Sequence, residues 1–222
     1  MSAAEGMALP RYGVSDELAS CVIHGIGIVL SVMGLVLLTV RAAIGGTASD
    51  VLASAVYGIS LILLYTASTL YHSVRTEPAR RILRTLDHIA IFLLIAGTYT
   101  PFTLIALRGT WGWSLFGIVW SLALLGSALE VGLLKRYRRL AVLLYVAMGW
   151  VGIVAFRPLL THLQTGGMVL LLAGGAAYTL GVPFYLWRRL PYHHSVWHFF
   201  VLAGSVLQFL AVFFYVVPAV RG

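Results

Sequence analysis

The stretch VLASAVYGISLILLYTASTLYH, residues 51–72, contains no charged side chain. It is long enough to cross a lipid bilayer, which takes about 20 residues in a helix. Across the whole chain of 222 residues, 60% are apolar or aromatic, 10% are charged, and the mean hydropathy is +0.95. A soluble domain carries about 25% charged residues. The composition therefore predicts an integral membrane protein.

Six further stretches have the same apolar character, and charged residues fall between them. The seven expected spans are residues 20–40, 51–71, 83–107, 111–133, 140–160, 167–187 and 196–217. Long apolar runs favour helices, because the strands of a membrane barrel are short and alternate apolar with polar residues. We therefore predict an all-α, polytopic bundle of seven transmembrane helices. The connecting loops are short, so residues 16–222 are expected to form one domain after a flexible tail over residues 1–15.

The basic residues predict how the bundle is oriented. With seven spans, the amino terminus and the second, fourth and sixth loops share one face. That face holds most of the 15 basic residues, namely Arg11, Arg75, Arg80, Arg81, Arg84, Lys135, Arg136, Arg138, Arg139, Arg188 and Arg189. The other face holds Arg41, Arg108, Arg157 and Arg221. The positive-inside rule then places the amino terminus in the cytoplasm and the carboxyl terminus outside a multi-pass plasma-membrane protein.

The net charge of +8 also predicts an attraction to anionic lipid headgroups. Nucleic-acid binding is disfavoured, because the basic residues are divided among short loops next to the membrane. The single cysteine, Cys21, excludes an internal disulfide and is expected to be a packing residue. Pro101, Pro158 and Pro183 lie within spans, where they are expected to kink or locally unwind the helices.

Polar side chains collect at the cytoplasmic ends of the predicted helices. Six of the 7 histidines belong to this face, and His162 is the exception. The polar residues at these ends are Glu17, Ser20, His24, Ser68, His72, Asp87, His88, Glu130, His193, His194 and His198. Ionisable groups in a membrane segment are costly and point to function unless they lie at the interface. We interpret His88 and His193 as candidate interfacial anchors. The candidate site consists of Glu17, Ser20, His24, Ser68, His72, Asp87, His194 and His198.

Helical spacing indicates which of these side chains share a face. His194 and His198 are four residues apart, so both imidazoles can bind one metal ion. A third ligand from His72 would leave a position for water, the arrangement of catalytic rather than structural zinc sites. Three imidazoles suit zinc, and also iron, nickel or copper. Glu17, Ser20 and His24 follow one helical stripe, as do Ser68 and His72.

Three motifs resemble those of the bacterial hemolysin III family, which is related to the progestin and adipoQ receptors. The first is ELASCVIHG, residues 17–25, in which the family usually has asparagine at the position of Ser20. The second is STLYH, residues 68–72, followed by DHIAIFLLIAGTYTP, residues 87–101. The third is HSVWH, residues 194–198. The resemblance covers the chain from Glu17 to about Val217.

The resemblance implies a seven-helix fold with an intracellular amino terminus, the orientation that the charge pattern predicts independently. It also implies that Zn²⁺ is held by His72, His194 and His198, with Asp87 near the water on the metal. The wider superfamily includes alkaline ceramidases, which hydrolyse a lipid amide.

These observations lead to a mechanistic hypothesis of lipid amide or ester hydrolysis. Zn²⁺ would activate water and polarise the lipid carbonyl, and Asp87 would accept and return the proton. Ser68 would orient Asp87 or steady the oxyanion. Glu17, Ser20 and His24 are expected to support the metal ligands from behind.

Two other classes of function stay open at the level of the sequence. One is a cytolytic pore, as the family name suggests, and the other is a membrane sensor or regulator with a structural zinc ion. A pore is disfavoured because the outer halves of the helices are nearly all apolar.

Overall fold

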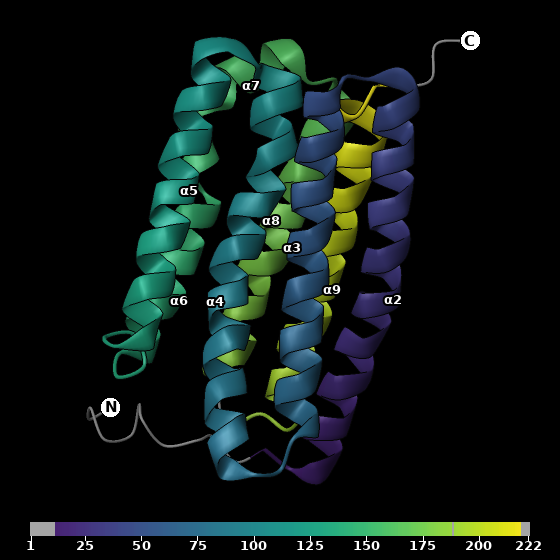
Figure 1. The fold of residues 1–222 in the computed structure, drawn as a ribbon. Helices are drawn as coiled ribbons and strands as arrows, with labels where there is room; N and C mark the ends of the chain where they lie inside the picture. The colour runs from purple at the N-terminus through teal and green to yellow at the C-terminus, as the bar shows by residue number, and fades with distance from the viewer. Residues whose placement is uncertain (1–11, 188, 219–222) are drawn as a thin grey trace.

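The computed structural model describes residues 12–187 and 189–218, and this part of the chain forms helices and no strands (Figure 1). Within it, 7 helices are long and apolar enough to cross a membrane. The unbroken helices are α3 (Ala48–Ser73), α5 (Gly109–Val131) and α8 (Thr165–Leu186), together with α2 (Val14–Gly45). The others are α4 (Glu77–Pro101) continued by η1 (Phe102–Leu107), α9 (His193–Ala211) continued by η3 (Val212–Val216), and α6 (Arg138–Gly149), which leads through η2 (Val151–Ala155) into α7 (Phe156–His162).

Each predicted stretch coincides with one of these spans, so the predicted fold class is confirmed. The largest differences are at two helix starts: α2 begins at Val14 instead of residue 20, and α4 at Glu77 instead of residue 83. Both helices begin with a polar turn. A prediction based on apolar stretches does not include such a turn. Residues 1–11 of the tail predicted over residues 1–15 lie outside the described residues.

The first helix shows why the bundle suits a membrane. Its buried residues recur every three or four positions and so form one helical stripe. They are Asp16, Ser20, His24, Gly27, Ser31, Gly34, Leu38 and Ala42. The opposite face exposes large apolar side chains, including Val22, Val29 and Val36. A soluble protein rarely exposes so continuous an apolar face, whereas lipid tails solvate it.

Alternating direction brings the predicted site residues to one end of the bundle. The helices α2, α4, α6 and α9 all begin at the lower end in Figure 1, and α3, α5 and α8 finish there. We call this the histidine end, because His72 near the end of α3 and His194 and His198 at the start of α9 all lie there.

Two of the three membrane prolines coincide with a departure from α-helical geometry. Pro101 is the last residue of α4, and the span continues as the π-helical segment η1. Pro158 lies in α7, directly after the 3₁₀ segment η2. Pro183 instead lies within α8, which stays α-helical from Thr165 to Leu186. A missing backbone N–H frees a carbonyl, and neighbouring turns adjust to it.

The π-helical segment also sets a close contact with α5. A Cβ atom at Gly112 would lie only 2.2 Å from the carbonyl oxygen of Thr103. Because the obstacle is backbone, a side-chain rotation cannot relieve the overlap. Gly117 lies in the same helix, and a Cβ atom there would meet nothing within 4 Å.

We therefore expect Gly112→Ala to destabilise the bundle by about 1–3 kcal/mol, the usual cost of overpacking a core. Gly117→Ala is the matched control and should be neutral or slightly stabilising, because alanine favours a helix over glycine. Thermal unfolding of both variants in detergent measures the difference. Equal unfolding temperatures for the two variants would contradict the close contact between α5 and η1.

Candidate metal centre

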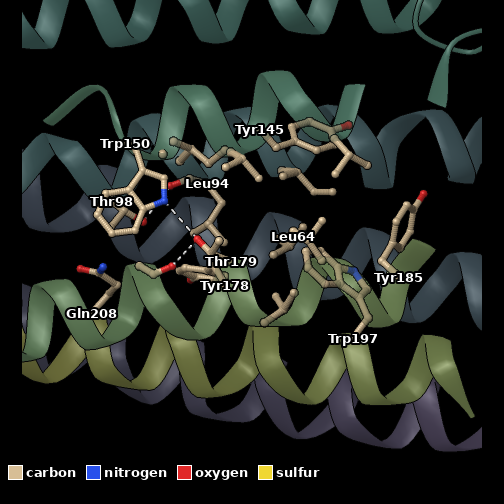
Figure 2. Close-up of a pocket in the computed structure, with 18 of the residues that line it drawn as sticks. Leu64, Leu94, Thr98, Tyr145, Trp150, Tyr178, Thr179, Tyr185, Trp197 and Gln208 are labelled. Atoms are coloured by element: carbon tan, nitrogen blue, oxygen red, sulfur yellow. Dashed lines mark hydrogen bonds between the residues drawn. The ribbon is translucent and has the colours of Figure 1, made fainter. Parts of the chain in front are cut away.

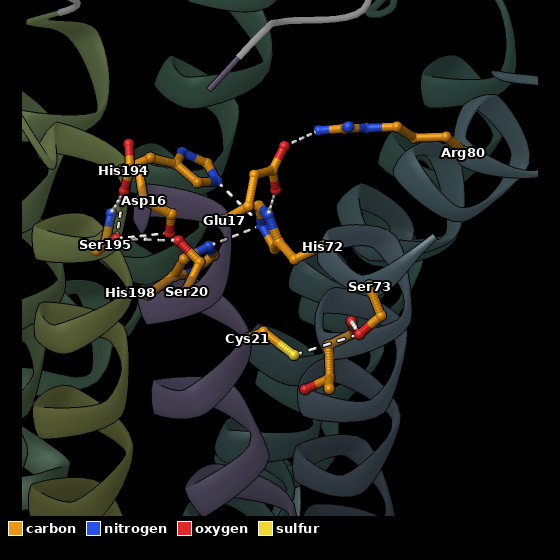
Figure 3. A network of polar contacts seen from close by, with 11 residues as sticks. Asp16, Glu17, Ser20, Cys21, His72, Ser73, Arg80, His194, Ser195 and His198 are labelled. Atoms are coloured by element: carbon orange, nitrogen blue, oxygen red, sulfur yellow. Dashed lines mark hydrogen bonds and ion pairs between the residues drawn. The ribbon is translucent and has the colours of Figure 1, made fainter. Parts of the chain in front are cut away.

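Three buried histidines converge at the histidine end (Figure 3). His72 Nε2 lies 3.2 Å from His194 Nε2 and 3.0 Å from His198 Nε2. One ring nitrogen from each of the three residues lies within 4.8 Å of the others. The three side chains are therefore close enough to hold a metal ion, although they come from helices far apart in the sequence.

The hydrogen bond behind His72 determines what this cluster can do chemically. His72 Nδ1 lies 2.5 Å from Glu17 Oε2. A carboxylate can only accept, so Nδ1 carries the proton and Nε2 presents its lone pair to the other two histidines. Crowded imidazole nitrogens need a proton or a metal ion between them. A carboxylate behind the imidazole is the usual arrangement for a metal-binding histidine.

Glu17 is in turn held by Arg80, a contact that the sequence did not indicate. Arg80 Nη2 donates to Glu17 Oε1 (Figure 3). The Arg80 guanidinium also lies 5.1 Å from the centre of the Tyr71 ring. In the sequence Arg80 contributed only to the count of basic loop residues. In the fold it binds one oxygen of Glu17, and the other oxygen of Glu17 faces His72.

Asp16 anchors the start of α9, and with it two of the three histidines. Its Oδ1 accepts a hydrogen bond from the backbone N–H of Ser195 at 3.0 Å and another from Ser195 Oγ. The helix begins after Tyr192, which has φ 55° and forms no side-chain cap. Asp16 of α2 therefore supplies the cap that α9 lacks locally. Ser20 reaches the same place, with its Oγ 3.2 Å from Ser195 Oγ.

The remaining predicted residues lie around the cluster in different ways. Ser20 thus contacts Ser195 and not a metal-ligand candidate. The His24 ring packs edge-on against His198 with 3.8 Å between ring centres, and neither of its buried nitrogens has a hydrogen-bond partner among the described residues. Asp87 and Ser68 are buried on the neighbouring helices α4 and α3. The fold therefore brings all eight predicted site residues to one end of the bundle.

His88 is not an interfacial anchor, which corrects one interpretation of the sequence. It is buried, and its Nδ1 lies 2.9 Å from Glu130 Oε1. Arg138 Nη1 lies 3.2 Å from the same oxygen, and Arg138 Nε donates to Tyr185 Oη at 2.5 Å. A charge buried in a bundle needs a partner, and Glu130 Oε1 and Arg138 pair within a contact network that joins α4, α5, α6 and α8.

Tyr12 covers the cluster on its outer side. Its ring stacks on His194 with 4.2 Å between centres and an interplanar angle of 19°. Burial raises the pKa of the Tyr12 phenol well above its ordinary value, so the hydroxyl stays neutral. The residue therefore acts through stacking and not as a charged group.

A cavity of about 1300 Å³ opens beside the histidines and continues deep into the bundle. His194, His198, His24 and Asp87 line its polar end. Figure 2 shows Tyr185 and Tyr145 toward one end, and Trp150 and Gln208 toward the other. The volume exceeds the roughly 300–1,000 Å³ of pockets for drug-sized ligands. The cavity therefore has room for a ligand larger than a drug-sized molecule.

Comparison with known proteins gives consistent matches over nearly the whole chain. A family model described as "Haemolysin-III related" matches residues 12–209. Hemolysin-3 of Bacillus cereus is 48% identical over 205 residues, covering 92% of this chain and 94% of that protein. The Hemolysin-3 homolog of Bacillus subtilis (strain 168) is 45% identical over 206 residues, covering 93% and 97%.

A more distant relative is the human monocyte to macrophage differentiation factor, 26% identical over 211 residues, with 90% of this chain and 84% of that protein covered. No solved structure gives a significant match. The resemblance drawn from the three sequence motifs is confirmed.

The cap from Asp16 to α9 gives a test that does not depend on a metal. Asp16→Ala removes the acceptor of the Ser195 N–H and should lower the free energy of unfolding by about 0.5–2 kcal/mol. Asp16→Asn keeps an acceptor oxygen in the same place, so its free energy of unfolding should fall by less. Thermal unfolding in detergent compares the two. An equal loss in both would mean that the charge of Asp16, and not its capping oxygen, is what matters.

Proposed function

The chain belongs to the haemolysin III family, and from this premise we propose that it is a zinc-dependent hydrolase of lipid amides or esters. The observation that carries the proposal is a cluster of three buried imidazoles, two of which line a cavity that a buried carboxylate also lines. Membrane lipids are the proposed partners, and we do not propose binding of nucleic acid.

The donor set fits Zn²⁺. Zinc–nitrogen distances of about 2.0–2.1 Å at tetrahedral angles place two ligand nitrogens roughly 3.4 Å apart. The separations of 3.0 and 3.2 Å from His72 to its two neighbours are close to this value. Bound there by His72, His194 and His198, the ion supplies Lewis-acid activation of a water and of a carbonyl group. Glu17 fixes the His72 tautomer that binding requires.

Asp87 is the proposed general base and acid. It is buried and lines the same cavity as His194 and His198. In hydrolysis the oxygen of water forms a bond to the lipid carbonyl carbon, and the bond to the leaving nitrogen or oxygen breaks. Asp87 takes the proton from the water and returns it to the leaving atom. Ser68, buried on the neighbouring helix α3, is the residue proposed to orient the Asp87 carboxyl for both transfers.

The cavity supports a lipid over a soluble substrate. Away from the histidines its walls are largely apolar, with Leu94, Phe102, Leu107, Leu115 and Met168 among them. An acyl chain fits this part, and the carbonyl group then lies at the polar end. The abundance of basic residues at the histidine end supports placing that end, and the amino terminus, in the cytoplasm of a cell-membrane protein.

The two alternative functions, a pore and a zinc-containing sensor, fit the cavity and Asp87 less well. Relatives carry the name Hemolysin-3, but a conducting pore needs polar groups along its whole length, and the far part of this cavity is largely apolar. A sensor with a structural zinc ion has no need for a buried carboxylate beside the cavity. The position of Asp87 therefore favours hydrolysis.

Metal binding is tested on purified protein in detergent. Wild-type protein should hold about one zinc ion per chain, and His72→Ala, His194→Ala and His198→Ala should each lose it. Glu17→Gln should weaken zinc binding by about 10–100-fold, the usual effect of removing the partner of a metal-bound histidine. His193→Ala, one residue from His194, is the control and should keep the ion. Full zinc content in His72→Ala would rule out the ligand assignment.

Hydrolysis is tested with a panel of lipid amides and esters in mixed micelles. Asp87→Asn should keep its zinc and lose about 10²–10⁴-fold in turnover, the usual contribution of a general base. Leakage of dye from liposomes measures the pore alternative in parallel. Leakage that persists in the histidine variants, without lipid cleavage by wild type, would favour the pore over the hydrolase.

A further inference from the structure

The cavity wall at the histidine end is strongly basic, and the proposed hydrolysis does not use this property. Among the described residues that line the cavity, four are arginines and one, Asp87, is acidic. The arginines are Arg84, Arg138, Arg139 and Arg189. They come from α4, from the start of α6 and from the segment after α8, so they approach the polar end from three sides.

Arg138 is the fixed member of this set. It is only 5% exposed, and its guanidinium is held by Glu130, Tyr185 and His88. Tyr185 lines the cavity beside it. An arginine held in this way presents its charge at a fixed position, at little further loss of side-chain entropy when a ligand binds.

The carboxylates near the cavity do not balance the arginines. Glu130 pairs with Arg138, and Asp87 is the one acidic residue among the described residues that line the cavity. Arg139 and Arg189 are exposed, and no acid lies opposite them among the described residues that line the cavity. The polar end therefore carries an excess of positive charge even before a metal ion is added.

The rest of the cavity has the dimensions of a lipid chain. Along α8 it extends from Leu186, near the arginines, to Met168 near the other end. At 1.5 Å per residue this is about 27 Å, close to the roughly 30 Å thickness of a bilayer core. A ligand that fills it has an apolar chain parallel to the helices and an anionic group at the arginine end.

We propose that the cavity selects lipids whose headgroup contains a phosphate, with Arg138, Arg139 and Arg189 forming the headgroup subsite. This inference rests on the proposed function only in taking the cavity as a lipid site. A phosphate fits better than a carboxylate, because its tetrahedral oxygens can reach donors on several sides, whereas a carboxylate lies in one plane. The polar end lies level with the metal centre, so the headgroup and the reacting carbonyl lie at the same depth.

The test measures binding to metal-free protein, so it does not depend on catalysis. Fluorescent phosphatidic acid and fluorescent diacylglycerol with the same chains are titrated into the protein in neutral detergent. Wild type should bind phosphatidic acid at least about 10-fold more tightly. The double variant Arg139→Gln/Arg189→Gln should lose most of this preference without a change in diacylglycerol binding. Both positions are exposed, so the variant should fold.

The matched control is Arg75→Gln/Arg136→Gln, which removes two exposed arginines from the same end that do not line the cavity. This control should keep the preference. Equal binding of the two lipids by wild type, or an equal loss in both double variants, would overturn the subsite. Oleate binding as tight as that of phosphatidic acid would overturn the choice of phosphate. Displacement of the probe by inorganic phosphate at similar concentration would overturn the choice of a lipid. A negative result in the hydrolysis assay would leave these binding results unaffected, because binding is measured on metal-free protein.

Discussion

His72 lies between a carboxylate and two imidazoles, and the arrangement of the histidine end follows from this position. Its Nδ1 is bound to Glu17, so its Nε2 must face His194 and His198 with a lone pair. A buried lone pair of this kind is costly when it is left unpaired, so it needs a hydrogen-bond partner or a metal ion. The contact joins α2 to α3, and the facing imidazoles join α3 to α9. In the fold α2 packs against both α3 and α9.

Around this contact, charged groups are held in pairs that cross between helices. Arg80 holds Glu17, Asp16 holds the start of α9, and Glu130 holds Arg138 and His88. Each pair fixes one wall of the polar end, and the long apolar cavity begins beside them. The chemistry of a metal-dependent hydrolase and the recognition of a charged headgroup can therefore share one opening, with separate residues for each.

The seven spans could be predicted from the sequence, because hydropathy is a local property. The end of the bundle at which each residue lies then follows from the alternating direction of the spans. The seven spans, and the gathering of His72, Asp87, His194 and His198 at one end, follow from counting apolar runs. The partners of the buried charges could not be predicted in this way. Arg80 and Arg138 look like ordinary basic loop residues, and Glu130 ends an apolar helix. Only the packing of four helices shows that they satisfy buried groups. Asp16 was missed because it caps a helix that begins far from it in the sequence.

The central claim is that His72, His194 and His198 bind a single metal ion through imidazole nitrogen. X-ray absorption spectroscopy of the purified, zinc-loaded protein tests it most directly, because the outer-shell scattering of imidazole rings gives their number. The account predicts three imidazoles and one lighter ligand at distances of about 2.0–2.1 Å. A sulfur ligand, or fewer than three imidazoles around the zinc, would contradict it.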